Sequence, residues 1–336
     1  MFARLDKSTT VRSPGSSPRL SRAMGALDAL SPSLASRVAE RIFTTPHRRV
    51  PRDWERSVLA EAVPFRIRAG GTEVRGARVG GGPAVLLVHG WGGGGAQLAA
   101  FVPPLLDAGC TAVVFDGPTH GASDGATATI PELADAVREV ARRTGARAAI
   151  GHSAGGAAVA LALHRGLVLD AAVLIGPPRS GAGILDAFCA EMRLGADTRE
   201  RLRRRIERRA GVLVGDLEFA VLAAGLSTPA LVIHDREDRE VAFDDGAAIA
   251  EAWPAARLLT TGGLGHRRIL RDPAVIREAR AFVVGQLARC GCGRLATETV
   301  DGDARCETCL LERHLARREE RRAGMADALT GPGAGP

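Results

Sequence analysis

The sequence contains no tyrosine and few other aromatic residues, which together make up 4% of its 336 residues. Proteins that bind single-stranded nucleic acids use aromatic rings on which the bases stack, and this chain offers few of them. Its net charge of +7 comes largely from arginines that are interleaved with acidic residues, as in the run 199–209. Within that run Leu202 and Ile206 lie four residues apart, which predicts an amphipathic helix with a solvated charged face. We therefore expect no nucleic-acid partner.

Long apolar runs are absent as well. No stretch approaches the length that is needed to cross a bilayer, and residues 1–20 hold no apolar segment like that of a secretory signal peptide. We therefore expect a cytoplasmic protein without a membrane span. In a reducing compartment, the six cysteines indicate metal binding or plain burial rather than disulfides.

A serine lies between two glycines in the segment Gly151-His152-Ser153-Ala154-Gly155. An apolar stretch precedes this segment and a run of small residues, 157–163, follows it. The pattern is typical of a nucleophile elbow, a sharp strand-to-helix turn that exposes the serine hydroxyl. A Cβ at either glycine would clash with the turn or with the neighbouring strand. The pattern predicts that Ser153 is a nucleophile, and the alternative is an ordinary small turn residue.

Four other segments complete a recognisable order along the chain. Apolar residues 84–88 lead into His89-Gly90-Trp91-Gly92, and residues 116–125 form a glycine-rich loop. Residues 230–238 end in acidic side chains, and residues 257–266 end in a glycine-rich loop with His266. Together with the elbow, these segments resemble the α/β-hydrolase superfamily, specifically its serine esterases and lipases, over residues 50–288. Thr119 departs from the pattern, because the family usually has glycine at this position.

The resemblance implies a catalytic triad of Ser153, Asp238 and His266. Ser153 would attack an acyl carbon, His266 would take its proton, and Asp238 would orient the imidazole. The backbone N–H groups of Trp91 and Ala154 would stabilise the oxyanion that forms. We expect no cofactor for this reaction.

Other residues compete for the roles of acid and base. Asp235 and Glu237 lie on the same loop as Asp238, but in the family the acid follows a strand-terminal glycine by three residues. Asp235 occupies that glycine-like position, which favours Asp238 and leaves Asp235 as a hydrogen-bonding loop residue. His266 alone follows the last strand, where the family base lies. The remaining candidates are interpreted as structural or less well placed: His89, His120, His152 and His234.

Apolar segments alternate with helical stretches between residues 84 and 289. Continuous apolar strands separated by amphipathic helices predict a mostly parallel sheet with helices on both faces, which is the α/β class. A leading hairpin is expected at 65–78, and a short helix at 33–44. The predicted strands are 84–89, 111–116, 147–152, 171–176, 230–235 and 257–261, and the predicted helices are 97–108, 130–144, 154–166, 244–253 and 273–289.

With 46% hydrophobic residues, the chain can bury the core of one large domain plus a small appendage. We assign residues 33–289 to the α/β-hydrolase domain. Its insert at about 177–228 is helical in character, and in hydrolases of this kind such an insert commonly forms a lid. Residues 1–32 and 319–336 are expected to be disordered tails.

Four cysteines lie close together in residues 290–318. The pairs Cys290/Cys292 and Cys306/Cys309 are joined by a short turn-rich link, as in a zinc ribbon. The first pair encloses only one residue, which departs from the usual spacing of two. The sequence predicts a structural zinc, with His314 as an alternative ligand and a redox-active dithiol or free thiols as alternative states. Cys110 and Cys189 are expected to be buried apolar residues.

We therefore predict a serine hydrolase that cleaves a carboxylic ester or a related small acyl substrate through an acyl-enzyme. A serine at the elbow disfavours the dehalogenases and epoxide hydrolases of the superfamily, which use aspartate. An acyltransferase or thioesterase with the same triad is the alternative enzyme. The alternative from another class is a non-catalytic scaffold whose zinc module recruits a protein partner.

Overall fold

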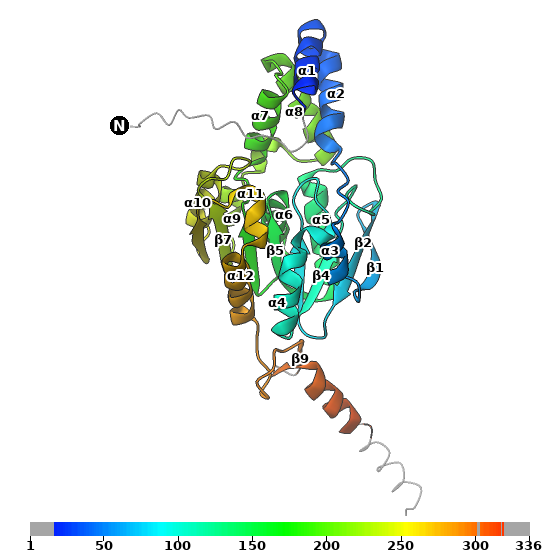
Figure 1. Ribbon diagram of the computed structural model, residues 1–336, viewed down its shortest axis with the longest axis vertical. Helices are drawn as coiled ribbons and strands as arrows, with labels where there is room; N and C mark the ends of the chain where they lie inside the picture. The colour runs from blue at the N-terminus through cyan, green and yellow to red at the C-terminus, as the bar shows by residue number, and fades with distance from the viewer. Residues whose placement is uncertain (1–16, 301–302, 317, 319–336) are drawn as a thin grey trace, which may run out of the picture.

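The computed structural model describes residues 17–300, 303–316 and 318. Eight strands form one sheet with helices on both faces, and a separate group of helices lies beyond one edge of it (Figure 1). This architecture confirms the predicted α/β fold class. In the described ranges, no helix combines the length and the apolar character that a membrane crossing requires.

The sheet has the strand order β1-β2-β4-β3-β5-β6-β7-β8. Strands β3 to β8 pair in parallel, as predicted, whereas β1 and β2 form the predicted hairpin and β2 pairs antiparallel with β4. Parallel strands end at one edge, so the loops that follow β3, β4, β5, β7 and β8 gather there. The bounds are β1 Val63–Ala69, β2 Thr72–Val79, β3 Ala84–Val88, β4 Thr111–Phe115, β5 Ala146–His152, β6 Ala171–Ile175, β7 Ala230–Asp235 and β8 Ala256–Thr261.

Each face of the sheet has its own apolar core, because alternate side chains of a strand point to opposite faces. Leu86 and Val88 of β3 pack against α5 and α6, whereas Val85 and Leu87 pack with α4 and α12. The helices of the body are α3 Asp53–Val58, α4 Val102–Asp107, α5 Ile130–Thr144, α6 Ala154–His164, α9 Phe219–Ala223, α10 Phe243–Ala252, α11 Gly265–Arg268 and α12 Pro273–Gln286, with 3-10 turns η1 Gly95–Phe101, η2 Val214–Asp216 and η3 Ile269–Arg271.

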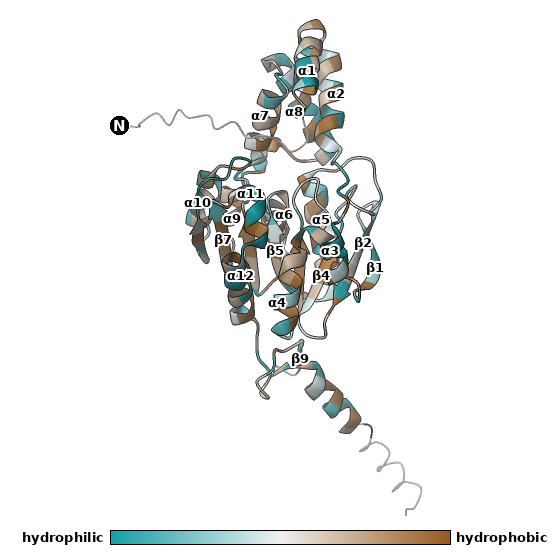
Figure 2. Cartoon of the chain, viewed as in Figure 1, coloured by the Kyte–Doolittle hydropathy of each residue, from teal (hydrophilic) through white to brown (hydrophobic). Residues whose placement is uncertain are grey.

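Four helices form a cap beyond the carboxyl edge of the sheet: α1 Pro18–Leu30, α2 Pro32–Thr44, α7 Gly181–Glu191 and α8 Ala196–Ala210 (Figure 1). They share an apolar cluster in which Met24 and Ala39 meet Phe188, Leu202 and Ile206. Figure 2 shows hydrophilic and hydrophobic residues side by side on these helices. Leu202 and Ile206 are buried, as the amphipathic pattern of α8 predicts.

The expectation of a disordered tail at residues 1–32 is wrong for residues 18–30, because these residues form helix α1. The Ser17 hydroxyl accepts a hydrogen bond from the backbone N–H of Leu20, and a proline at the first helical position has the backbone angle that a helix start requires. Asp28 then accepts a hydrogen bond from the N–H of Gly195, which ties α1 to the insert. Serine and proline thus mark helix starts here rather than a mobile segment. The other expected tail residues, 1–16 and 319–336, lie outside the described ranges.

The cap is fastened to the loop that follows β4. The N–H of Ala128 donates to the carbonyl of Thr44 at the end of α2, and the Arg48 guanidinium donates to the carbonyls of Gly121 and Gly125. Helix α11, which carries His266, lies at the same end of the molecule as the cap (Figure 1). The cap therefore stands next to the edge where the predicted site residues lie.

A small cysteine-containing module follows α12 at the opposite end of the molecule (Figure 1). Its two short strands, β9 Glu298–Val300 and β10 Asp303–Arg305, pair antiparallel. A hollow of about 330 Å³ between the module and the body is lined by the glycines that precede β3 and by Ala108 and Gly109, which precede β4. The module is thus next to the amino edge of the sheet, away from the cap.

Replacing Leu202 by alanine tests whether the cap is held by its own core. Leu202 is fully buried in the cap cluster, so Leu202→Ala should lower the free energy of unfolding, measured by urea denaturation, by about 2–5 kcal/mol. Leu213, which is 57% exposed, provides the matched control, and Leu213→Ala should change little. Equal effects of the two substitutions would contradict the packing described here.

Candidate active site

Ser153 lies in a sharp turn between β5 and α6. Its backbone has φ 54° and ψ −124°, and a positive φ is strained for a residue with a Cβ. The glycines of the elbow allow the turn, since a Cβ on Gly155 would lie 2.4 Å from the carbonyl oxygen of His89. A Cβ on Gly151 would likewise lie 2.7 Å from the carbonyl oxygen of Gly155. The strand-turn-helix geometry predicted from the sequence is therefore present.

The loop after β3 lies directly against Ser153. A Cβ on Gly90 would be 2.9 Å from Nδ1 of His152 and 3.1 Å from the Cβ of Ser153, so a side chain here would have to displace one of these residues. Among the described residues, the Ser153 hydroxyl makes no hydrogen bond, and the N–H groups of Trp91 and Ala154 have no acceptor. The unpaired N–H groups thus belong to the residue after Ser153 and to the residue after Gly90, which lies against Ser153. The N-terminus of α6 adds the positive end of its dipole at this point.

Asp238 and His266 meet although 28 residues separate them along the chain. His266 Nδ1–H donates to Asp238 Oδ2 at 2.6 Å, and both side chains are almost fully buried. The other oxygen of Asp238 accepts hydrogen bonds from the N–H groups of Glu240 and Val241. Burial raises the pKa of Asp238, but the imidazoles of His234 and His266 and the N–H of Val241 outweigh this effect and hold it below its ordinary value. The carboxylate is therefore ionised, and it fixes the His266 proton on Nδ1.

The competing acids have other surroundings. Asp235 is fully buried and accepts hydrogen bonds from the N–H of Glu237, the hydroxyl of Thr261 and the N–H of Leu264. It ties the loop after β7 to the loop after β8, as expected for a hydrogen-bonding loop residue. Glu237 is exposed. Of the three acids, Asp238 is the one that contacts His266.

His89 and His120 are neutral rings that shape the loops around Ser153. His89 donates to the carbonyl of Gly90 and accepts from the N–H of Gly117, both at 2.8 Å. His120 donates to the carbonyl of Pro118 and accepts from the N–H of Gly92. Burial lowers the pKa of His89 to about 4 and that of His120 to about 3. These bonds agree with a structural role for both.

Thr119 adopts a left-handed backbone with φ 71°. This conformation favours glycine, which is the residue that the family usually has at this position. Thr119 is buried, and its hydroxyl oxygen has no hydrogen-bond partner among the described residues. Thr119 therefore has the backbone conformation that a glycine would adopt here, and this conformation is strained for a residue with a Cβ.

The two remaining histidines lie beside the Asp238–His266 pair. His234 has Nε2 at 3.6 Å from Asp238 Oδ2 and donates to the carbonyl of Val241. His152 donates from Nε2 to the backbone carbonyl of His266 at 2.9 Å, and the two rings are 4.6 Å apart. The sequence alone gave no signal for this second contact, because it joins residues 114 positions apart.

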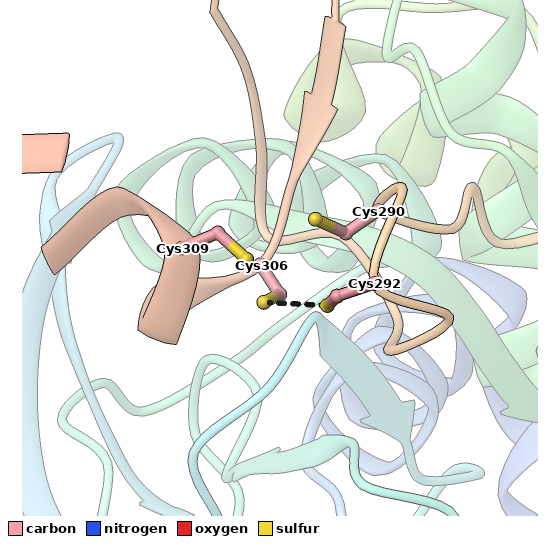
Figure 3. Close-up of side chains that lie close together, drawn as sticks. All are labelled: Cys290, Cys292, Cys306 and Cys309. Carbon is pink, nitrogen blue, oxygen red and sulfur yellow. Dashed lines mark hydrogen bonds between the residues drawn. The ribbon is translucent and has the colours of Figure 1, made fainter. Parts of the chain in front are cut away.

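The four predicted cysteine ligands come together in the C-terminal module (Figure 3). All four sulfur atoms lie within 4.8 Å of one another, and those of Cys292 and Cys306 are 3.5 Å apart. This cluster could hold a metal ion. His314 lies at an exposed position outside the cluster, so the structure favours the four-cysteine set over the alternative with histidine.

Cys110 and Cys189 lie outside the cluster, in the apolar cores of the body and of the cap. Both are buried, and burial raises the pKa of each thiol to about 11. Such thiols stay protonated and pack as small apolar groups, which agrees with the expectation for these two residues.

Comparison with known proteins adds a family to this geometry. The sequence pattern of the alpha/beta hydrolase family matches residues 85–323, more than half of the chain. No curated protein matches the sequence closely enough to be informative.

Solved structures of several hydrolases share the fold. An esterase from Pyrococcus furiosus superposes with a TM-score of 0.57 at 17% identity, over 72% of this chain and 97% of that one. An esterase from Exiguobacterium antarcticum gives 0.52 at 16% identity, over 66% and 99%. A serine hydrolase from Cycloclasticus zankles gives 0.52 at 17% identity, over 67% and 98%. Identities this low establish the fold alone.

The neutral histidines of the site make stability depend on pH. Since the pKa of His120 lies below its ordinary value of 6.5, its contribution is complete above about pH 6.5 and is lost as the pH falls toward its native pKa. The free energy of unfolding should therefore decrease from pH 7 to pH 4, by on the order of 3 kcal/mol for one such histidine. Urea denaturation at several pH values measures this decrease.

The variant His120→Gln keeps an acceptor for the N–H of Gly92 but cannot titrate, so its decrease should be smaller than that of the native protein. His164 is exposed, and His164→Gln should behave as the native protein does. A decrease in His120→Gln as large as in the native chain would show that His120 does not contribute.

Proposed function

Because the chain belongs to the α/β hydrolase family, we propose that it is a serine hydrolase with Ser153 as nucleophile, His266 as base and Asp238 as acid. The observation that carries the proposal is the buried 2.6 Å contact between His266 and Asp238, at the same edge of the sheet as the strained turn at Ser153. A carboxylate on Nδ1 leaves Nε2 of His266 free to accept a proton. The unpaired hydroxyl of Ser153 is the matching proton donor.

The proposed reaction passes through an acyl-enzyme. Ser153 Oγ forms a bond to the acyl carbon while its proton moves to His266 Nε2. The oxyanion is stabilised by the N–H groups of Trp91 and Ala154, and each such donor is worth about 3 kcal/mol in the transition state. The carbon–oxygen bond to the alcohol then breaks, and the alcohol leaves with the proton from His266. Water repeats the sequence and releases the carboxylic acid.

We propose a carboxylic ester as the substrate. Two of the proteins that share the fold are esterases and a third is a serine hydrolase, which supports a hydrolytic reaction. Acyl transfer or thioester cleavage on the same three residues is the alternative enzyme, and it differs in the acceptor or in the leaving group. The non-catalytic scaffold, the cytoplasmic location and the absence of a nucleic-acid partner stay predictions.

A fluorophosphonate probe tests the nucleophile. The native protein should be labelled on Ser153, and Ser153→Ala should abolish labelling because no other group at the turn can form the bond. Asp238→Asn should lower kcat on p-nitrophenyl butyrate by about 10⁴-fold, since the imidazole loses the carboxylate that sets its tautomer. Mass spectrometry and initial rates provide the readouts.

Ser57 is exposed and serves as the matched control, because Ser57→Ala should label as the native protein does. Folded native protein that resists the probe, or Ser153→Ala protein that still reacts, would rule out Ser153 as the nucleophile.

We also propose that Cys290, Cys292, Cys306 and Cys309 bind a structural zinc ion. Thiolates at about 2.3 Å from a tetrahedral zinc are about 3.8 Å apart, and the sulfur atoms here already lie within 4.8 Å of one another. Four thiolates fill the coordination shell, so the ion would stabilise the module and take no part in the reaction. In this small module, which has two three-residue strands, a metal would replace a larger core.

Metal analysis of the purified protein should find one zinc ion per chain, and Cys306→Ser should lose most of it. Fluorophosphonate labelling of Cys306→Ser should persist, because the module lies at the other end of the molecule from Ser153. Cys110→Ala is the control and should keep its zinc, since Cys110 belongs to the core of the body. Native protein that contains no metal, even after zinc is supplied, would overturn the zinc proposal.

A further inference from the structure

His152 connects the turn that carries Ser153 to the segment 262–268, which carries His266 and is called the base loop below. It is the last residue of β5, directly before Ser153, and the residue is 2% exposed. Its Nε2 lies 2.9 Å from the carbonyl oxygen of His266. An oxygen acceptor requires a proton on Nε2, so the ring must be the Nε2–H tautomer. Through this hydrogen bond, His152, the residue next to the proposed nucleophile, contacts the backbone of the proposed base.

The base loop is held by the hydrogen bond from the N–H of Leu264 to Asp235 and by the pairing of Arg267 with Glu240. His266 lies in the four-residue helix α11, which follows a glycine-rich segment with positive φ at Gly263 and Gly265. The side chain of His266 is held by Asp238, whereas these other contacts act on residues on either side of it and not on its own carbonyl. The hydrogen bond from His152 adds a restraint at the carbonyl of His266 itself. Contact between the two rings at 4.6 Å further limits where the His266 ring lies.

His152 is suited to this task because it stays neutral. Burial lowers its pKa well below the ordinary value, and the neighbouring His266 lowers it further. The other charged groups that act on it are Asp238 and Arg267. His152 therefore does not compete with His266 for the proton that leaves the serine. A neutral donor also holds the base loop without repelling the imidazolium that forms there.

The other ring nitrogen of His152, Nδ1, also indicates that the ring is kept for its bond to His266. Nδ1 is buried and has no hydrogen-bond partner among the described residues, and a Cβ on Gly90 would lie 2.9 Å from it. A buried ring nitrogen without a hydrogen-bond partner lowers the stability of the folded protein. The donor at Nε2 is the one polar interaction of this side chain within the described ranges, and it goes to His266.

We propose that His152 is a positioning residue, which fixes His266 relative to Ser153 through the hydrogen bond to the His266 carbonyl. The inference rests on the proposed triad, because positioning has a meaning only if His266 is the base. A base displaced by about 1 Å can lower the rate about a hundredfold. Loss of this bond should therefore reduce kcat on p-nitrophenyl butyrate by about tenfold to a hundredfold and leave KM nearly unchanged.

Two polar variants separate positioning from a general packing role. In His152→Gln the side-chain amide reaches as far as Nε2 and can donate to the same carbonyl, so most of kcat should remain. In His152→Asn the amide is one methylene shorter and falls short of the carbonyl, so kcat should drop. Both variants carry the same functional group in the same buried place, and their free energies of unfolding are compared to account for stability.

Each outcome decides the proposal. Retention of kcat in His152→Gln with loss in His152→Asn supports it, whereas equal kcat in the two folded variants overturns it. His152→Leu, which removes all donors, should match His152→Asn. Native protein that fails to react with the fluorophosphonate probe would instead overturn the triad itself, so the two failures are distinct.

Discussion

The strained backbone of Ser153 is the constraint on which the site depends. Its φ of 54° is held because the start of α6 and the end of β5 approach the loop after β3 without intervening side chains. Gly90, Gly151 and Gly155 each occupy a place where a Cβ would clash. A methyl group at any of the three glycines would have to move a neighbouring backbone or histidine.

A second constraint acts on protonation. Five buried histidines line the carboxyl edge of the sheet: His89, His120, His152, His234 and His266. His89, His120 and His152 all have a pKa lowered by burial, and each donates one hydrogen bond to a backbone carbonyl. His266 is the ring that donates to an ionised carboxylate. Under the proposed mechanism, these surroundings favour His266 over His89, His120 and His152 as the proton acceptor.

Much of this arrangement could be predicted from the sequence, because each proposed site residue follows an apolar strand and parallel strands end at one edge. The preference for Asp238 over Asp235 also agrees with the hydrogen bonds of the two loops. Helix α1 was missed because its serine, proline and arginine content resembles a tail, whereas burial of Met24 against the insert stabilises it. The contact of His152 with His266 could not be predicted, since it depends on how two loops pack in three dimensions.

The most direct measurement is a crystal structure of the protein after reaction with a phosphonate. The account predicts a bond from phosphorus to Ser153 Oγ, with the phosphoryl oxygen about 3 Å from the backbone nitrogens of both Trp91 and Ala154 and with Nε2 of His266 facing the adduct. An adduct on another residue, or one on Ser153 whose oxygen points away from both nitrogens while His266 faces elsewhere, would contradict it.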